Sequence, residues 1–264
     1  MISRRRKVVF PFHYRPDKKL VHIVAELEDE PGALASLLNL VGAKVNLEGT
    51  TSYNVGGGTS IFSGFGEIVS SSETASSIQS LAALSRKVRR CQVWESEEGL
   101  LVDTFHTGLQ TGLGEPYIML PASGLAHTFE KIVHRFGTGG ETILFMEGKE
   151  FAEARFSIYR PMLGARPERR IKEATHIFEA LGYGSSSVST SQSKDSLTLT
   201  VEECFECTKG STNGRTCAFM RGVAVGSFSA LFRQELTAKE VTCRLKGGKA
   251  CVFVLTPTDG HALQ

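Results

Sequence analysis

The chain has 264 residues, of which 41% are hydrophobic and 22% are charged, and its formal net charge at pH 7 is +2. This length and composition are typical of a globular protein with two domains of ordinary size. No apolar run approaches the roughly 20 residues that a membrane-spanning helix needs, which excludes a transmembrane protein.

The N-terminal segment is strongly basic. Residues 1–20 hold seven basic residues and one acidic residue, Asp17, so this segment carries a local charge of +6 and the rest of the chain −4. The apolar patch before Pro11 is too short for a signal peptide, which predicts a cytoplasmic protein. No helix-turn-helix pattern or interleaved aromatic residues accompany the basic residues. We therefore expect residues 1–19 to form a solvated tail, and we expect no nucleic-acid partner.

Residues 20–97 follow one pattern of strands and helices. The segment Val21–Leu27 is an apolar strand, and the helix from Ala33 to Val41 presents a face of leucines to the core. The remaining expected elements are strands over 46–53 and 60–68, a helix over 74–84 and a strand over 88–94. The predicted order is therefore strand, helix, strand, strand, helix, strand.

This order and the turn Asp29-Glu-Pro-Gly-Ala-Leu34 resemble the ACT domain, a ferredoxin-like module that binds amino acids or other small effectors, commonly at a dimer interface. The resemblance implies a homodimer in which the effector contacts this turn and the following strand. The corresponding residues here are Asp29, Gly32, Ala33, Leu34 and Asn46. The free N–H groups and the positive dipole end of the helix suit an effector carboxylate. An ACT fold that only dimerises or packs on its neighbour is the alternative.

Residues 98–264 form the second expected domain, which begins with helices and ends in an antiparallel sheet. The expected helices cover residues 124–136, 147–163, 167–181 and 214–236, and the expected strands cover 187–191, 196–203 and a hairpin within 241–255. Glycines in the run 137–140 are expected to end the first helix. The fold class is therefore predicted to be α+β, a ferredoxin-like domain followed by a helix-rich domain with an antiparallel sheet.

The second domain contains residues whose types and spacing suit a closed metal site. Cys217, Glu240, Cys243 and Cys251 offer three thiolates and one carboxylate, which complete a tetrahedron around zinc. Four protein ligands leave no position for a substrate water, so the zinc would be structural. Small buried core cysteines are the alternative. The charged residues and glycines between Cys243 and Cys251 indicate a polar hairpin tip instead of a core strand.

Three runs resemble the 4-vinyl reductase domain: Cys204-Phe-Glu-Cys207, Gly214-Arg-Thr-Cys217-Ala-Phe-Met-Arg-Gly222 and Lys239-Glu-Val-Thr-Cys243-Arg-Leu-Lys-Gly-Gly-Lys-Ala-Cys251. This family includes chlorophyll-pathway proteins and the sensor modules of aromatic-responsive transcription activators. Its fold is shared by haem-based sensors of nitric oxide and by vesicle-tethering subunits. In phenol-sensing members a cysteine, a Glu-x-x-Cys and a last cysteine hold zinc beside the ligand pocket, which implies the same four ligands here. Those members line the pocket with aromatic residues where this chain has Arg221 and Ala238, which argues against phenol as the ligand.

Two further groups of residues leave alternatives open. Cys204 and Cys207 form a CxxC at the end of a predicted strand, and a metal-binding, a redox or a local structural role fits this pair. His127, Glu130 and His134 share one helix face and could ligate a second metal, but any amphipathic helix has this spacing on its polar side.

No nucleophile elbow, Rossmann fingerprint, P-loop or HExxH motif indicates catalysis. We therefore expect a small-molecule sensor or regulatory protein, for example in transcription regulation, with an amino-acid-like effector in the first domain and a hydrophobic ligand in the zinc-containing second domain. Its output would pass through a protein partner or through a contact of the basic tail. The alternatives are an enzyme or accessory subunit acting on an aromatic or tetrapyrrole-like substrate, and a scaffolding protein for assembly.

Overall fold

The computed structural model describes residues 6–96, 98–164, 166–208 and 216–263. The chain divides into two compact units, Met1–Ile118 and Met119–Gln264, and both combine helices with antiparallel sheets, which confirms the α+β class. None of the helices in the described ranges has both the length and the apolar character that a membrane crossing requires.

The two compact units meet between Ile118 and Met119, beyond the predicted domain boundary at residue 98. The reason is a pair of short strands, β1 (Phe12–Tyr14) and β6 (Leu100–Val102), which form an antiparallel ladder. This ladder attaches the segment after residue 98 to the first unit and makes part of the expected tail a strand. Residues 1–5 of that tail lie outside the described residues.

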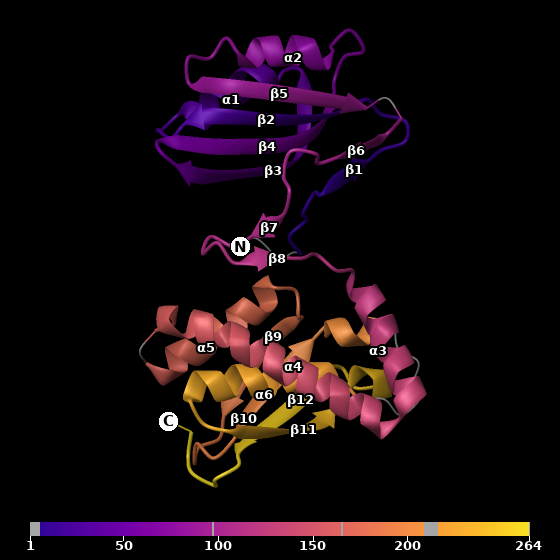
Figure 1. Ribbon diagram of the computed structural model, residues 1–264, viewed down its shortest axis with the longest axis vertical. Helices are drawn as coiled ribbons and strands as arrows, with labels where there is room; N and C mark the ends of the chain where they lie inside the picture. The colour runs from indigo at the N-terminus through magenta and orange to yellow at the C-terminus, as the bar shows by residue number, and fades with distance from the viewer. Residues whose placement is uncertain (1–5, 97, 165, 209–215, 264) are drawn as a thin grey trace. The chain divides into compact units, whose positions relative to one another are not determined.

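The first unit has the expected order of elements (Figure 1). Its further elements are β2 (Leu20–Glu28), α1 (Ala33–Val41), β3 (Val45–Gly56), β4 (Thr59–Ile68), α2 (Ala75–Ala82), β5 (Val88–Ser96), β7 (Leu109–Gln110) and β8 (Pro116–Tyr117). The main sheet has the strand order β3-β4-β2-β5, and all of its neighbours are antiparallel. The short strands β7 and β8 form a small hairpin around Gly112 and Gly114.

Side-chain alternation along β2 explains how this unit is layered. Val21, Ile23 and Ala25 point to one face, where they pack against Leu37 of α1 and Ile78 of α2 in a buried apolar cluster. The residues between them point to the opposite face. That face carries a second, smaller cluster of Leu20, Phe65 and Leu101, with Phe10 and Trp94 packed against it.

The second unit contains the expected helices and strands, with shifted ends. Its elements are α3 (Ala122–Phe136), α4 (Thr138–Tyr159), η1 (Arg160–Met162), α5 (Pro167–Ala180), β9 (Ser185–Thr190), β10 (Leu197–Glu202), η2 (Phe205–Cys207), α6 (Ala218–Phe232), β11 (Leu236–Thr242), η3 (Arg244–Lys246) and β12 (Cys251–Pro257). The sheet has the order β11-β12-β10-β9 and is antiparallel throughout.

Two helices in this unit differ from their expected bounds. Gly137 ends α3 as predicted, but α4 starts at the very next residue, so Gly139 and Gly140 are helical instead of marking a loop. The helix α6 ends at Phe232, where Arg233 adopts the left-handed conformation with φ of 54°. The expected start of α6 at Gly214 lies outside the described residues. Strand β11 then begins at Leu236, the last residue of the predicted helix, and includes Ala238 and Glu240.

The helices α4 and α6 pack backbone against backbone. A Cβ atom added at Gly222 would lie 2.0 Å from the carbonyl oxygen of Phe145, and one added at Gly226 would lie 2.1 Å from that of Lys149. From the other side, a Cβ at Gly148 would lie 2.2 Å from the carbonyl oxygen of Phe219. Only glycine allows so close an approach of two helices. Most side chains of α6 are buried, as expected for a helix that is covered by other elements.

Candidate functional site

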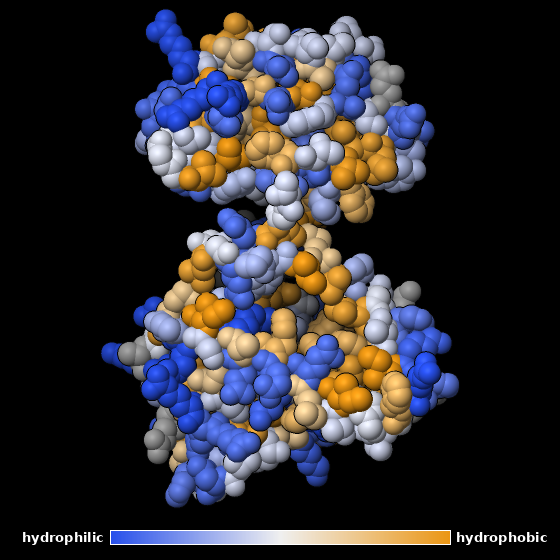
Figure 2. Space-filling view, in the orientation of Figure 1, coloured by the Kyte–Doolittle hydropathy of each residue, from blue (hydrophilic) through white to orange (hydrophobic). Residues whose placement is uncertain are grey.

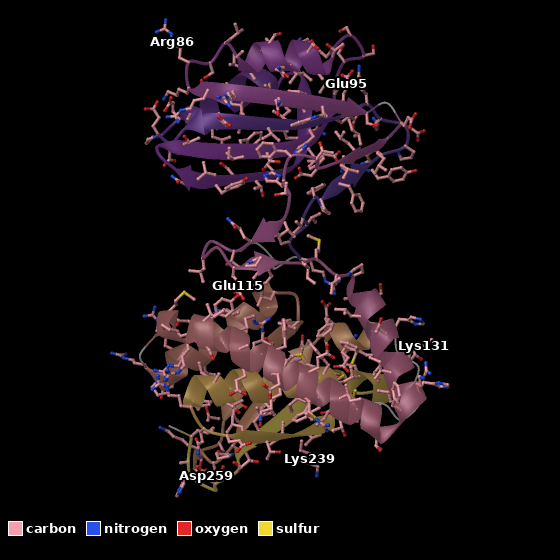
Figure 3. All side chains as sticks on the ribbon, in the orientation of Figure 1. Arg86, Glu95, Glu115, Lys131, Lys239 and Asp259 are labelled. Carbon is pink, nitrogen blue, oxygen red and sulfur yellow. The ribbon has the colours of Figure 1, made fainter. Side chains whose placement is uncertain are left out.

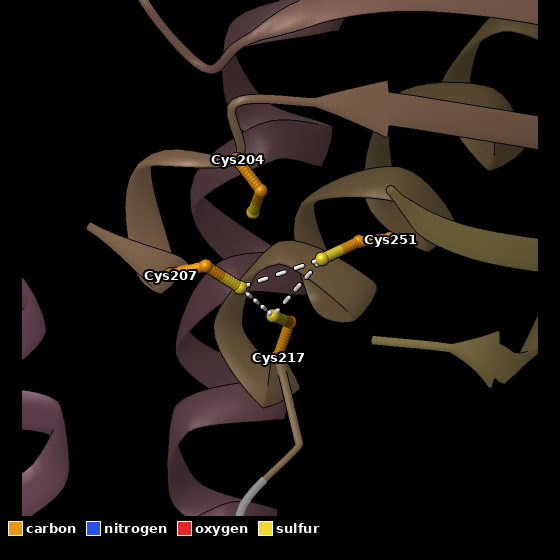
Figure 4. Close-up of side chains that lie close together, drawn as sticks. All are labelled: Cys204, Cys207, Cys217 and Cys251. Carbon is orange, nitrogen blue, oxygen red and sulfur yellow. Dashed lines mark hydrogen bonds between the residues drawn. The ribbon is translucent and has the colours of Figure 1, made fainter. Parts of the chain in front are cut away.

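The end of the sheet and the start of α6 bring five cysteines together. Cys217 is the N-cap residue of α6, and Cys251 begins β12, where it pairs in register with Val201 of β10. Beyond the end of β10, Cys204 is the N-cap residue of the short helix η2 and Cys207 is its last residue. Figure 4 shows the sulfur atoms of these four residues pointing toward one another. The CxxC therefore follows a strand, as predicted, and lies close to the start of α6.

The sulfur atoms lie at distances that suit one metal ion. The Sγ atom of Cys217 is 3.1 Å from that of Cys207, 3.6 Å from that of Cys243 and 3.6 Å from that of Cys251. The Cys207 and Cys251 sulfurs are 3.4 Å apart. Two thiolates bound at 2.3 Å to one tetrahedral zinc ion lie roughly 3.8 Å apart. Sulfur atoms this close suit one mononuclear centre.

Glu240 adds a carboxylate to the same cluster. Figure 3 shows its neighbour Lys239 pointing away from β11, and because side chains alternate along a strand, Glu240 faces inward. Its Oε2 accepts a hydrogen bond of 3.1 Å from the backbone N–H of Cys217, whereas its Oε1 is buried without a hydrogen-bond partner among the described residues. Burial raises the pKa of this carboxyl group. A bulge in β11 follows at residue 241, before Cys243.

The donor atoms form two overlapping groups of four. Cys217, Glu240, Cys243 and Cys251 are one group, and Cys204, Cys207, Cys217 and Cys251 are the other; within each group the donor atoms lie within 4.8 Å of one another. The first group is the predicted ligand set. The second adds the CxxC, for which spacing alone could not decide between roles. The orphaned Oε1 of Glu240 shows that these residues fit a cation, because a buried carboxylate oxygen without a partner is costly.

The thiols also share protons with one another. Hydrogen bonds from Cys204 first, and then from Cys217, Cys243 and Cys251, lower the pKa of the Cys207 thiol. Hydrogen bonds with Cys204 first, and then with Cys207 and Cys243, raise the pKa values of the Cys217 and Cys251 thiols. A metal cation takes the place of such shared protons when thiolates bind it.

Backbone groups around the cluster support negative charge. The N–H of Arg244 points at the Cys251 sulfur at 3.5 Å, and Cys217 stands at the N-terminus of α6, where the helix dipole favours a thiolate. The buried Glu206, inside the CxxC, accepts a 2.8 Å hydrogen bond from the N–H of Met220 in the first turn of α6. Glu206 therefore couples η2 to α6, a role that its sequence position did not indicate.

An aromatic cluster adjoins the cysteines. Phe205 lies inside the CxxC and Phe219 lies two residues after Cys217, and their ring centroids are 6.0 Å apart. Phe219 also stacks on Phe129 at 4.9 Å, and Tyr183 contacts Phe205 at 5.6 Å. The metal donors and the aromatic cluster therefore lie on the same short segments of chain. Arg221, expected at a pocket-lining position, places its guanidinium 5.1 Å from the centre of the Phe145 ring.

The expected effector residues of the first unit are only partly together. Asp29 and Gly32 lie in the turn before α1, where Gly32 has φ of 83°, and the next residues, Ala33 and Leu34, begin the helix. Asn46 lies at the other end of the sheet, because it pairs with Glu67 at the far end of β4. Asn54 of β3 instead hydrogen-bonds the Asp29 carboxylate. Because β4 pairs antiparallel with both β3 and β2, the end of β3 with Asn54, and not its start with Asn46, lies beside the end of β2 that leads to Asp29.

His127, Glu130 and His134 belong to neither donor group found among the described residues. His127 and His134 are solvent-exposed on α3, which agrees with the polar side of an amphipathic helix.

Residues 197–257 match the model of the V4R domain, which confirms a 4-vinyl reductase domain in this part of the chain. No curated protein matches the chain. Among solved structures, it is similar to the phenol-responsive sensory domain of the transcription activator PoxR with phenol, at 17% identity and a TM-score of 0.47 over 63% of this chain and 87% of that one.

Two further solved structures are distantly similar. One is a vinyl-4-reductase family protein from Methanocaldococcus jannaschii, at 21% identity and a TM-score of 0.37 over 54% of this chain and 83% of that one. The other is a trafficking protein particle complex subunit 3 from Naegleria fowleri covalently bound to palmitic acid, at 13% identity and a TM-score of 0.41, over 54% of this chain and 97% of that one.

Proposed function

We propose that this protein is a cytoplasmic small-molecule sensor or regulatory protein whose C-terminal unit holds one structural zinc ion beside a site for a hydrophobic ligand. The observation that carries the proposal is the convergence of buried thiols on Glu240, whose Oε1 has no other partner among the described residues. Sensing fits this arrangement better than catalysis, because four protein ligands leave the ion no position for a substrate.

Cys217, Glu240, Cys243 and Cys251 would hold the zinc. Bound there, the ion would supply no reaction chemistry and would instead cross-link the start of α6 to the turn end of the β11-β12 hairpin, where β11 ends and β12 begins. Cys204 and Cys207 would be the alternative donors. They form the second group together with Cys217 and Cys251, which also belong to the first group. Because Phe205 and Phe219 lie beside these cysteines, the zinc would also hold the aromatic cluster in place.

We further propose that the first unit is an ACT domain. Its strand order β3-β4-β2-β5 with two helices on one face supports a ferredoxin-like module. An amino-acid-like effector would bind at the turn from Asp29 to Leu34, with Asn54 in the place that the sequence analysis gave to Asn46. A homodimer formed by this unit, and a protein partner that carries the output, complete the proposed regulatory role.

The zinc proposal is tested by metal analysis of untagged protein purified without added metal. We expect about one zinc per chain in the wild type and a loss of most of it in Cys243→Ser, because a neutral hydroxyl replaces one of four ligands. Cys204→Ser, which removes a donor of the second group only, is expected to retain the metal. Cys91→Ser is the matched control, since Cys91 lies in the first unit.

The results separate the two donor groups. Metal loss in Cys204→Ser with retention in Cys243→Ser would assign the ion to the CxxC group instead. A wild-type protein without metal would overturn the proposed zinc site and leave the cysteines as core or redox residues.

A further inference from the structure

Arg155 of α4 is a buried cation without an acidic partner. Its side chain is only 6% exposed, and no ion pair joins it to a carboxylate within the described ranges. Its Nη1 donates a hydrogen bond of 2.6 Å to the hydroxyl group of Tyr183. Its Nε and Nη2 are buried and have no hydrogen-bond partner in the described part of the chain. Buried guanidinium groups normally pair with an anion, so this arrangement is incomplete.

The surroundings of Arg155 are aromatic. Its guanidinium carbon lies 5.1 Å from the ring centres of Phe151 and Tyr183 and 5.7 Å from that of Phe156. These rings stabilise the positive charge through cation–π contacts. They offer no hydrogen-bond acceptor in the plane of the guanidinium, however, so the N–H groups at Nε and Nη2 stay unsatisfied.

The two unpartnered nitrogens define the kind of ligand. Nε and Nη2 form one edge of the guanidinium plane, and their N–H bonds run parallel, which matches the two oxygens of a carboxylate. Nη1, on the other side, is already occupied by Tyr183. An apolar setting with a single cation favours a singly charged carboxylate over a phosphate, whose second charge would stay unpaired.

Phe151 contacts the Arg155 guanidinium and also reaches the surface. Its side chain is 50% exposed, and its ring also contacts Phe219 at 6.4 Å. Figure 2 shows apolar side chains at the surface of the C-terminal unit along the face that α4 crosses in Figure 1. A half-exposed aromatic side chain can change rotamer without leaving a cavity in the core, and such a movement would admit a ligand to Arg155.

We propose that Arg155 binds the carboxylate of an aromatic acid, and that the apolar part of this ligand lies against Phe151, Phe219 and Tyr183. The inference rests on the proposed function, because it names the chemical class of the hydrophobic ligand in the C-terminal unit. Phe219 connects this site to the cysteine cluster, since it lies two residues after Cys217 and contacts Phe205. Arg155 is thus the polar group that orients the ligand in an otherwise apolar site.

The test compares an acid with its neutral amide. Calorimetric titrations of the full chain with 3-phenylpropanoate and with 3-phenylpropanamide are expected to show binding of the acid about 10- to 100-fold tighter. In Arg155→Gln the preference for the acid disappears, whereas Arg169→Gln, which changes an exposed arginine of α5, keeps it. Tyr183→Phe retains the ring, removes the hydroxyl that holds the guanidinium, and is expected to weaken acid binding several-fold.

A second arm uses octanoate, a carboxylate with an aliphatic tail. Weaker binding of octanoate than of 3-phenylpropanoate supports the aromatic part of the proposal, and tighter binding overturns it. Equal binding of acid and amide, or an acid preference that persists in Arg155→Gln, overturns the role of Arg155 but leaves a hydrophobic-ligand sensor intact. If Arg155→Gln does not fold, Tyr183→Phe decides. Metal content, measured on the same samples, reports on the zinc proposal separately. If zinc-loaded wild-type protein does not bind 3-phenylpropanoate, the proposed role of Arg155 is overturned and the zinc proposal is not.

Discussion

The two units of this protein hold their helices in place in different ways. In the first unit, α1 and α2 lie on the sheet through many large apolar side chains such as Leu37 and Ile78. In the second unit, α4 and α6 meet at glycines, and the start of α6 joins the sheet through a cluster of cysteines. Both units have a buried apolar core, and the second also depends on a few glycines and cysteines at which its segments meet.

The unfolding of the two units can be followed separately because the chain has one tryptophan, Trp94, which lies on β5 in the first unit. Its fluorescence reports the unfolding of that unit, whereas far-ultraviolet circular dichroism reports both units. A substitution that acts on the second unit alone should separate the two signals in a urea titration.

The largest effect is expected for Cys217→Ser, because Cys217 belongs to both donor groups. Loss of the metal should destabilise the second unit by about 4 kcal/mol or more, since a structural ion contributes folding free energy directly. The dichroism transition should move to lower urea while the Trp94 transition stays in place. Equal movement of both transitions would show that the two units do not unfold separately.

Gly222→Ala should have the next largest effect. Its new methyl group would meet the carbonyl oxygen of Phe145, so α4 and α6 must move apart, at a cost of roughly 3 kcal/mol. Gly139→Ala is the matched control: it lies in the first turn of α4, where a Cβ meets no atom within 4 Å. This control should leave stability unchanged or raise it by up to about 1 kcal/mol. Similar losses in both variants would contradict backbone packing as the cause.

His22 makes the first unit sensitive to pH. It is fully buried, hydrogen-bonds Ser63 and stacks on Phe65, and burial lowers its pKa; the nearby Asp103 raises this pKa and His106 lowers it, both to a smaller extent. The folded state therefore binds a proton less readily than the unfolded chain. Stability is fully present above the unfolded pKa and is lost as pH falls from there through the folded pKa.

The measurement is the Trp94 unfolding transition between pH 7.5 and pH 5. We expect it to move to lower urea as the pH falls, and to move less in His22→Gln, which has no ring to protonate. An identical pH dependence in the variant would assign the effect to other groups.

The smallest effect concerns the start of α2. The Thr74 hydroxyl accepts a hydrogen bond from the N–H of Ser77, and the Ser77 hydroxyl accepts one from the N–H of Thr74. Thr74→Ala should cost about 1 kcal/mol, and Thr74→Ser, which keeps the hydroxyl, should cost much less. Both are read from the Trp94 transition. A loss as large as that of Gly222→Ala would mean that the first unit also depends on single positions.

The first unit followed from local sequence almost completely. The helix Ala33–Val41 has its expected bounds, and each strand of the main sheet was expected within a few residues of its ends. The period of the apolar residues reports these elements because one face of each is buried. The strands β1 and β6 were missed, since three residues carry too little pattern and their pairing joins segments far apart in the chain.

The second unit was harder because its helices do not follow the usual pattern. Glycines such as Gly140 and Gly222 read as breaks or as neutral positions, whereas they allow two helices to touch. Glu240 was expected as a ligand, and its inward orientation required the strand β11, whose start at Leu236 lay inside the helix that the sequence predicted. Arg155 gave no sequence signal, because one arginine in a helix is ordinarily a solvent-exposed residue.

The sequence by itself determined the α+β class, the order of elements in the first unit and the donors Cys217, Glu240, Cys243 and Cys251 as one candidate set, because residue type and period are local properties. Only the tertiary structure decided that Cys204 and Cys207 face the same point, that Asn54 and not Asn46 reaches Asp29, and that Arg155 is buried without a carboxylate. These are contacts between distant segments, which depend on how strands pair and how closely helices approach.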